Sequence, residues 1–126
     1  MIKKKILLIE DEANIREVYA EVLSEAGYEV NQATNGQEGY DKALSEDWDL
    51  MLLDIMLPKK DGLDLLSDIK NQEKLKDKPV VLLTNLGKDT VMKEGMSHGA
   101  VSYLVKSEIN PSDVVSCVNR LFGVNA

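Results

Sequence analysis

Short apolar runs alternate along this chain with longer stretches of helical period, and this alternation constrains the fold most. Four runs are continuously apolar and a fifth alternates with polar residues: Lys5–Ile9, Leu50–Leu53, Val80–Leu83, Tyr103–Val105, and the alternating Tyr28–Ala33. A continuous apolar strand is typical of one buried on both faces, and an alternating strand of a sheet edge. The pattern predicts a parallel sheet with helices on both faces, an α/β fold, and leaves the strand order open.

Apolar residues at steps of three and four mark the helices between these strands. The first helix covers about residues 15–26 and ends at Gly27, where a left-handed residue fits best. Asn110 and Pro111 open the last helix with a capping residue and a proline at the first helical position. Three further helices are expected around Gln37–Ser45, Leu63–Ile69 and Val91–Met96, the last ending near Gly99.

Length and charge limit the kinds of protein this can be. The 126 residues contain no linker or repeat, so we expect one domain over residues 1–126. A net charge of −7 argues against direct binding to nucleic acid or to anionic lipid. Cys117 is the only cysteine, which excludes an internal disulfide, and the apolar run ending before Glu10 is too short for a signal peptide or membrane span. We therefore expect a soluble, cytoplasmic domain.

Polar side chains follow four of the expected strands. Glu10 and Asp11 come after the first strand, Asp54 after the third, Thr84 after the fourth and Lys106 after the fifth. Since the carboxyl ends of parallel strands line one ligand crevice, we expect these five side chains to lie together. Each alone has a plainer interpretation as a helix cap, a turn residue or a solvated charge. Their coincidence at one edge favours a functional site.

The chemistry of this set indicates phosphoryl transfer. Three neighbouring carboxylates repel one another and need a positive counter-charge. A site with only oxygen ligands, completed by water, suits Mg²⁺ better than a closed Ca²⁺ or Zn²⁺ site. A cation, a lysine and a hydroxyl together can neutralise charge on phosphoryl oxygens. Asp54 is the natural nucleophile, because carboxylates can form acyl phosphates.

Four segments resemble the receiver domain of two-component response regulators, the CheY-like family: Leu7–Glu12, Asp54–Gly62, Leu82–Asn85 and Gly99–Lys106. The resemblance covers essentially the whole chain, and its specificity lies in the four segments occurring in this order. It implies a doubly wound (βα)5, flavodoxin-like sheet with strand order 2-1-3-4-5. It also places the crevice between the first and third strands.

The resemblance implies a role for each site residue. Asp54 would accept a phosphoryl group from a phosphohistidine on a sensor histidine kinase or a histidine phosphotransfer protein. Asp11, Asp54 and the backbone carbonyl of Met56 would bind Mg²⁺, with Glu10 acting through a coordinated water. Lys106 would pair with Asp54 or with the phosphoryl oxygens.

The resemblance further implies a conformational switch. Phosphorylation adds about −1.5 to −2 charges; Thr84 would then turn toward the phosphoryl group and Tyr103 would turn inward. The fourth helix, fifth strand and fifth helix, about Lys88–Leu121, would form the surface read by a downstream protein, and a phosphorylation-dependent homodimer fits the same expectation. Without the resemblance, an aromatic residue such as Tyr103 in an apolar strand would be expected in the core.

At three positions the sequence departs from the family pattern, which limits how far the family's properties can be carried over to this chain. Ser107 stands where the family usually has a proline after a cis bond; a non-proline cis bond costs about 2.5–4 kcal/mol, so either that strain is retained or the loop runs differently. Asn85 is larger than the usual residue after the switch threonine and is expected to crowd phosphodonor access. Met56 and Leu86 flank the expected path of the hydrolytic water, and we hypothesise that their apolar side chains slow loss of the phosphoryl group.

Three other functions share parts of this residue pattern. Haloacid-dehalogenase-type phosphatases carry a second aspartate two residues after the nucleophile, where this chain has Met56, so we expect no enzyme beyond self-phosphorylation and slow dephosphorylation. The Gly-rich phosphate loops of nucleotide-binding modules do not occur, and a flavin-binding module is not favoured. A pseudo-receiver that binds partners without phosphorylation stays open. We expect no output domain after the last helix; a stand-alone regulator and a receiver from a longer protein both fit.

Overall fold

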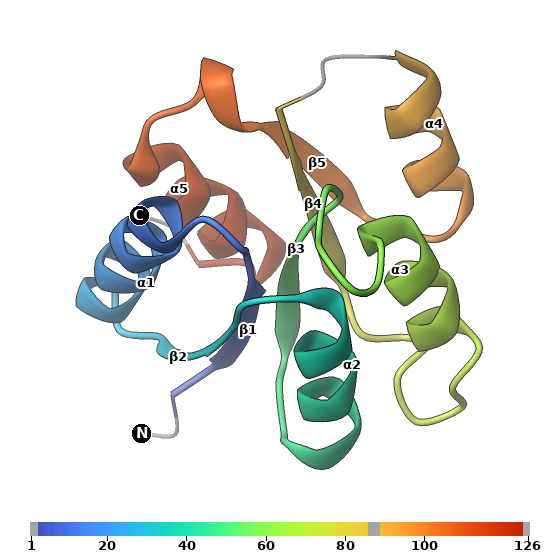
Figure 1. The fold of residues 1–126 in the computed structure, drawn as a ribbon. Coiled ribbons are helices and arrows are strands. Elements are labelled where there is room, and N and C mark those ends of the chain that lie inside the picture. Colours follow the sequence, from blue (N-terminus) through green and yellow to red (C-terminus); the bar gives the residue numbers. More distant parts are fainter. Residues whose placement is uncertain (1–2, 86–88, 125–126) are drawn as a thin grey trace.

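A computed structural model describes residues 3–85 and 89–124 and contains one five-stranded parallel sheet (Figure 1). In chain order the elements are β1 (Lys5–Ile9), α1 (Ala13–Glu25), β2 (Glu29–Ala33), α2 (Gly36–Ser45), β3 (Leu50–Asp54), α3 (Gly62–Lys70), β4 (Val80–Thr84), α4 (Asp89–Ser97), β5 (Ser102–Val105), the 3₁₀ helix η1 (Lys106–Glu108) and α5 (Pro111–Leu121). The strands lie in the order β2-β1-β3-β4-β5, and every neighbouring pair is parallel. The predicted α/β class and the strand order implied by the family resemblance are confirmed.

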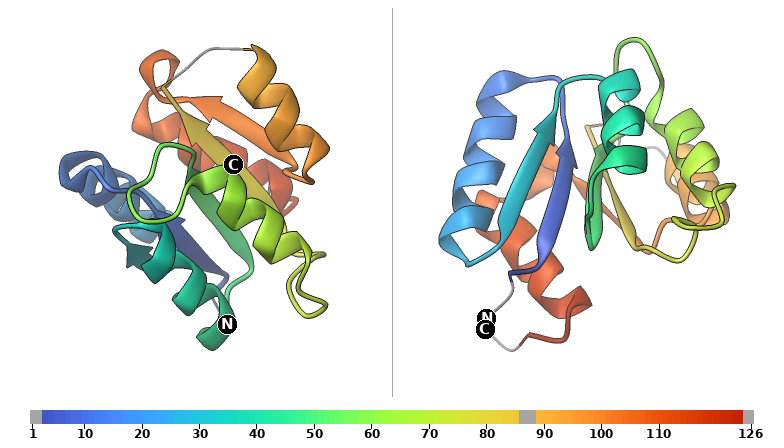
Figure 2. Two further views of the ribbon diagram at one scale, coloured as in Figure 1. Left: turned by 45° about the vertical axis from the view of Figure 1, so that its right-hand side comes forward. Right: turned by 90° about the horizontal axis from the view of Figure 1, so that it is seen from below.

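The helices cover both faces of the sheet, so the molecule has three layers (Figures 1 and 2). Helices α1 and α5 pack on one face, where Leu8 and Leu52 meet Leu23. Helices α2 and α3 pack on the other, where Leu53 meets Leu66, and α4 adds to that side. Successive strand residues point to opposite faces, so the continuous apolar runs supply both cores at once.

The predicted helix boundaries have their expected local causes. Gly27 and Gly99 follow α1 and α4 with φ of 100° and 105°, a backbone conformation that glycine adopts without a Cβ clash. The backbone N–H of Asn110 donates to the carboxylate of Asp113 at 2.8 Å at the start of α5. Within residues 3–85 and 89–124, no helix has the length and apolar character needed to cross a membrane.

One local expectation is corrected, and one alternative left open by the sequence is decided. Tyr103 is not a core residue: it is 40 % exposed, because β5 is an edge strand whose residues are only partly buried. The described chain has no cis peptide bond, so the segment after Lys106 avoids that strain and continues as the 3₁₀ helix η1. The loop therefore runs differently from the usual proline-containing one, as the energetic cost of a cis bond before Ser107 suggests. Leu86 and Lys88 lie outside the described residues.

Candidate functional site

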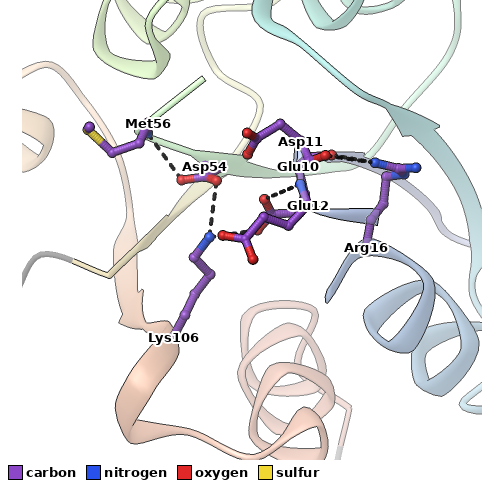
Figure 3. Close-up of polar contacts among 7 residues, drawn as sticks. All are labelled: Glu10, Asp11, Glu12, Arg16, Asp54, Met56 and Lys106. Atoms are coloured by element: carbon purple, nitrogen blue, oxygen red, sulfur yellow. Dashed lines mark hydrogen bonds and ion pairs between the residues drawn. The ribbon is translucent and has the colours of Figure 1, made fainter. Parts of the chain in front are cut away.

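All five polar side chains that were predicted to follow the strands lie at the carboxyl edge of the sheet. Glu10 and Asp11 follow β1, Asp54 and Thr84 are the last residues of β3 and β4, and Lys106 follows β5. Strands β1 and β3 are direct neighbours whose register pairs the residue before Glu10 with the residue before Asp54. The sheet thus brings together acids that are 44 positions apart in the chain (Figure 3).

Three carboxylates form one cluster at this edge. Glu10, Asp11 and Asp54 each offer an oxygen atom, and these atoms lie within 4.8 Å of one another. Glu10 and Asp54 are buried, whereas Asp11 is exposed, so the cluster is open to solvent on one side. An all-oxygen donor set with one open side fits Mg²⁺, which keeps several of its waters when it binds.

Lys106 bridges two members of the cluster. Its Nζ lies 2.8 Å from Oε1 of Glu10 and 3.0 Å from Oδ2 of Asp54, and its side chain is only 4 % exposed (Figure 3). One ammonium therefore faces two buried carboxylates, with the third carboxylate of Asp11 close by. The local charge is negative when all three acids are ionised, which favours a cation and raises the cost of a further anion.

Burial and mutual repulsion set the protonation of this group. Burial, together with the hydrogen bond and negative charge of Asp54, raises the pKa of Glu10 from 4.5 to about 7, although Lys106 opposes the shift. Burial also disfavours the charged form of Lys106, but its hydrogen bond with Glu10 and the charge of Asp54 more than offset this and raise the pKa of the ammonium. Near neutral pH the lysine is charged and Glu10 is close to its titration midpoint.

Backbone groups hold the remaining oxygen atoms in place. The N–H of Met56 donates to Oδ1 of Asp54 at 3.1 Å, and the N–H of Glu12 donates to Oε2 of Glu10 at 3.1 Å. Helix α3 begins directly against the end of β3: the N–H of Gly62 donates to the carbonyl of Ile55 at 2.9 Å. A Cβ on Gly62 would clash with the carbonyl oxygen of Asp54, so only glycine allows this approach.

The two predicted switch residues lie on neighbouring strands. Thr84 is fully buried at the end of β4, and the register pairs Leu82 of the same strand with Tyr103. Tyr103 lines a hollow of about 260 Å³ with Met92, Lys93 and Met96 of α4. The structure therefore places the tyrosine on the α4 side of β5 and away from the core.

A second hollow of about 350 Å³ lies beside Lys106, between α1 and the segment that leads into α5. Its lining residues are Asn14, Ile15, Val18, Tyr19, Asn85, Lys106, Ser107, Ile109 and Pro111. Asn85 thus lies at the rim of the site, and crowding of a phosphodonor by this side chain stays a prediction. Met56 is 58 % exposed, but its proposed partner Leu86 lies outside the described residues.

Sequence reasoning missed one residue that contacts the acidic turn. Nη1 of Arg16 donates to the carbonyl of Glu10 at 2.9 Å and lies 3.5 Å from that of Asp11, while Nε donates to Gln32 of β2 at 3.2 Å. The only signal in the sequence is a basic residue about one helical turn after the acidic triplet. That signal is weak, because the position of Gln32 cannot be read from the local pattern.

Comparison with known families and proteins gives one consistent match. A family model described as response regulator receiver domain matches residues 6–119. A curated relative, the transcriptional regulatory protein SrrA of Staphylococcus aureus, is 35 % identical over 117 residues, which are 93 % of this chain and 47 % of that protein. The chain therefore spans about half the length of the curated relatives that it matches.

Solved structures resemble the whole described fold. The chemotaxis response regulator CheY4 of Vibrio cholerae superposes with a TM-score of 0.89 at 29 % identity, covering 95 % of this chain and 99 % of that one. A CheX–CheY–BeF3–Mg²⁺ complex from Borrelia burgdorferi contains a chain that superposes with a TM-score of 0.88 at 26 % identity, covering 96 % of this chain and 90 % of that one. Fold, sequence and the acidic edge of the sheet thus lead to the same family.

Proposed function

Because this chain belongs to the response regulator receiver domain family, we propose that it is a signalling switch whose Asp54 accepts a phosphoryl group. The observation that carries the proposal is the buried ammonium of Lys106 between Asp54 and Glu10, beside the third acid, Asp11. A carboxylate, a fixed cation and an acidic cluster at the mouth of a parallel sheet are the parts that phosphoryl transfer needs. The phosphoryl group is a signal, and turnover is limited to self-phosphorylation and slow dephosphorylation.

The transfer step is a displacement at phosphorus. A carboxylate oxygen of Asp54 forms the new bond to phosphorus while the bond between phosphorus and the imidazole nitrogen of a phosphohistidine breaks, and that nitrogen keeps the electron pair. The donor is a sensor histidine kinase or a histidine phosphotransfer protein. Lys106 lies 3.0 Å from Asp54 and offsets the negative charge that accumulates on the phosphoryl oxygens.

The donor set favours Mg²⁺ as the partner ion. Asp11, Asp54 and the backbone carbonyl of Met56 would hold it, with Glu10 acting through a coordinated water; the proximity of the three carboxylates supports this assignment. When bound, the ion neutralises charge on the transferring group. Asp11 is exposed, which allows the ion to exchange with solvent without opening the core.

The switch is proposed to run from the phosphoryl group to the outer face of β5. Thr84 donates its hydroxyl to the new phosphoryl oxygens, and Tyr103 turns inward from its exposed position. The rearranged face of α4, β5 and α5 docks a downstream protein or a second copy of the chain. The net charge of −7 favours a protein partner over nucleic acid for these residues, and the cytoplasm is the compartment where histidine kinases would meet them.

The test is phosphorylation of the purified chain in MgCl₂ with acetyl phosphate. We expect a gain in mass of one phosphoryl group, and complete loss of that gain in Asp54→Asn. The matched control Asp47→Asn changes an exposed aspartate elsewhere and should be phosphorylated like the wild type. Omitting MgCl₂ should abolish the reaction.

Two results would contradict the proposal. A pseudo-receiver would show no gain in mass and no change in its amide NMR spectrum with beryllofluoride and MgCl₂. An unchanged modification in Asp54→Asn would place the acceptor elsewhere.

A further inference from the structure

We propose that Arg16 is a positioning residue that holds the Glu10–Asp11 turn so that both carboxylates reach the metal site, and that it thereby sets the affinity for Mg²⁺. This inference rests on the proposed function, because it concerns the same ion. It adds a residue of α1 that contacts none of the reacting atoms. The effect runs through the backbone that carries two of the three acids (Figure 3).

The guanidinium contacts the turn at consecutive carbonyl groups. Nη1 donates to the carbonyl of Glu10 at 2.9 Å and lies 3.5 Å from the carbonyl of Asp11. The planar, rigid fork of an arginine fixes the direction of its N–H groups, so these contacts fix the direction of the peptide planes as well. The orientation of each peptide plane determines where the attached side chain points.

The turn has few restraints besides Arg16; one is the hydrogen bond that the backbone N–H of Glu10 donates to the carbonyl of Ala33 at 3.1 Å. The turn lies between the end of β1 and the start of α1, and its N-cap residue, Glu12, makes no side-chain capping hydrogen bond. The carboxylate of Glu10 is held by Lys106 and by the N–H of Glu12. The carboxylate of Asp11, in contrast, makes no hydrogen bond or ion pair with any other described residue, so among these residues only the backbone of the turn restrains where it can reach. Asp11 is therefore the ligand most sensitive to loss of Arg16.

Arg16 is itself braced by the sheet. Its Nε donates to Oε1 of Gln32 at 3.2 Å, and Gln32 lies on β2, the strand paired with β1. The guanidinium thus joins helix α1, the acidic turn and strand β2. Outer-shell groups of this kind typically change metal affinity by about 10- to 100-fold when they are removed.

A simpler role for Arg16 is to lower the local negative charge, and this role predicts the opposite effect. Removing a cation near an acidic site strengthens the attraction for Mg²⁺, whereas loss of positioning weakens binding. The sign of the change in affinity therefore separates the two.

The experiment is an amide NMR titration of the full chain with MgCl₂, followed by initial rates of phosphorylation by acetyl phosphate. We expect Arg16→Met to raise the dissociation constant for Mg²⁺ about tenfold, near the lower end of the range for outer-shell groups. The phosphorylation rate of this variant should recover to near the wild-type value when MgCl₂ is saturating. Gln32→Met, which leaves every charge unchanged, should weaken binding by a smaller factor.

Arg120→Met is the matched control. Arg120 is exposed near the end of α5, which runs back toward the opposite edge of the sheet, so its loss changes the net charge equally without touching the turn. Arg120→Met should bind Mg²⁺ like the wild type. Should Arg16→Met fail to fold, Arg16→Lys keeps the charge and loses the fork, and it too should bind more weakly.

Unchanged or tighter Mg²⁺ binding in the folded Arg16 variants would overturn the inference, as would an equal loss in Arg120→Met. Failure of the proposed function looks different. In that case the wild-type chain itself would show neither Mg²⁺-dependent shifts at residues 10–11 and 54 nor phosphorylation.

Discussion

Glu10 and Asp54 share one ammonium group in a part of the molecule from which water is largely excluded. Their side chains are at most 3 % exposed, and that of Lys106 is 4 % exposed. At low local dielectric constant one cation does not fully compensate two anions, so Glu10 holds its proton more strongly than an ordinary glutamate. In the absence of a divalent ion, the repulsion between these two carboxylates is therefore an unfavourable electrostatic contribution to the folded state.

The first prediction concerns the pH dependence of stability without divalent ions. Because folding raises the pKa of Glu10 from 4.5 to about 7, the folded state binds this proton more tightly, and stability falls as pH rises through that window. The loss is on the order of 3 kcal/mol. Urea unfolding in EDTA from pH 4.5 to pH 8 should show this fall, and Glu10→Gln should flatten it. Glu21→Gln, at an exposed position of α1, should follow the wild type.

The second prediction concerns the shared cation. Lys106→Met leaves Glu10 and Asp54 without their partner, and an unpaired buried charge of this kind costs about 3–5 kcal/mol. The loss of stability should be largest at pH 8 and smaller at pH 5, where Glu10 is protonated. Urea unfolding in EDTA measures both values. A loss that did not depend on pH, or an equal loss in the exposed control Lys74→Met, would contradict the argument.

At the scale of elements, the junction between β3 and α3 determines how closely a helix approaches Asp54, the proposed phosphoacceptor. Gly62 is the first residue of α3, and its N–H donates to the carbonyl of Ile55, one residue after Asp54. The approach leaves no space for a side chain at this position. The end of the strand and the start of the helix are therefore in direct backbone contact beneath the site.

The third prediction tests this junction. A methyl group in Gly62→Ala would meet the backbone of Asp54 and Ile55, and overpacking of this kind costs about 1–3 kcal/mol. The variant should also be phosphorylated more slowly by acetyl phosphate, because Asp54 is displaced. Gly27→Ala separates packing from backbone strain: it has φ of 100° but no atoms within 4 Å of the new Cβ. It should lose about 1–2 kcal/mol and keep the wild-type rate.

At the scale of the whole molecule, the acidic edge and the α4–β5 surface are joined through β4. Thr84 ends β4 beside the acids, and β4 pairs along its length with β5, which carries Tyr103. The tyrosine is half exposed beside a hollow of about 260 Å³ lined by two methionines of α4. Methionine side chains adapt their shape readily, so this surface can accommodate the proposed inward turn of the tyrosine.

The fourth prediction tests transmission across the sheet. Beryllofluoride with MgCl₂ should shift the amide NMR signals of β5 residues 102–105, because the proposed switch couples the acidic edge to Tyr103. Thr84→Ala should still bind beryllofluoride at Asp54 but lose most of the shift at Tyr103. Thr34→Ala makes the same change at an exposed threonine and should behave like the wild type. Equal shifts in Thr84→Ala would show that coupling does not require this hydroxyl.

Much of the fold could be predicted because its causes are local or repetitive. The first strand, Lys5–Ile9, has the predicted bounds, since an apolar run that is buried on both faces ends where charge begins. Gly27 ends α1 as expected, because its φ of 100° is a conformation that other residues adopt with strain. The strand-end acids could be located in the same way, since parallel strands direct their carboxyl ends to one edge.

Other features could not be predicted, because they depend on distances between segments. The contact of Arg16 with Gln32 joins α1 to β2, and nothing in either segment specifies it. Tyr103 lies in an apolar run like those of the core strands, and only the edge position of β5 exposes it. The segment Lys106–Glu108 forms a 3₁₀ helix that no periodicity of the sequence indicates.

The amino-acid order by itself determined the layered α/β class and the edge at which the acids collect, because periodicity and strand direction are properties of each segment. Only the tertiary structure decided how strongly those acids interact. Burial of Glu10 and Asp54 around a single ammonium group, and the brace from Arg16 to the neighbouring strand, arise when distant segments pack together and exclude water. Electrostatic energies depend on that exclusion, and no local pattern encodes it.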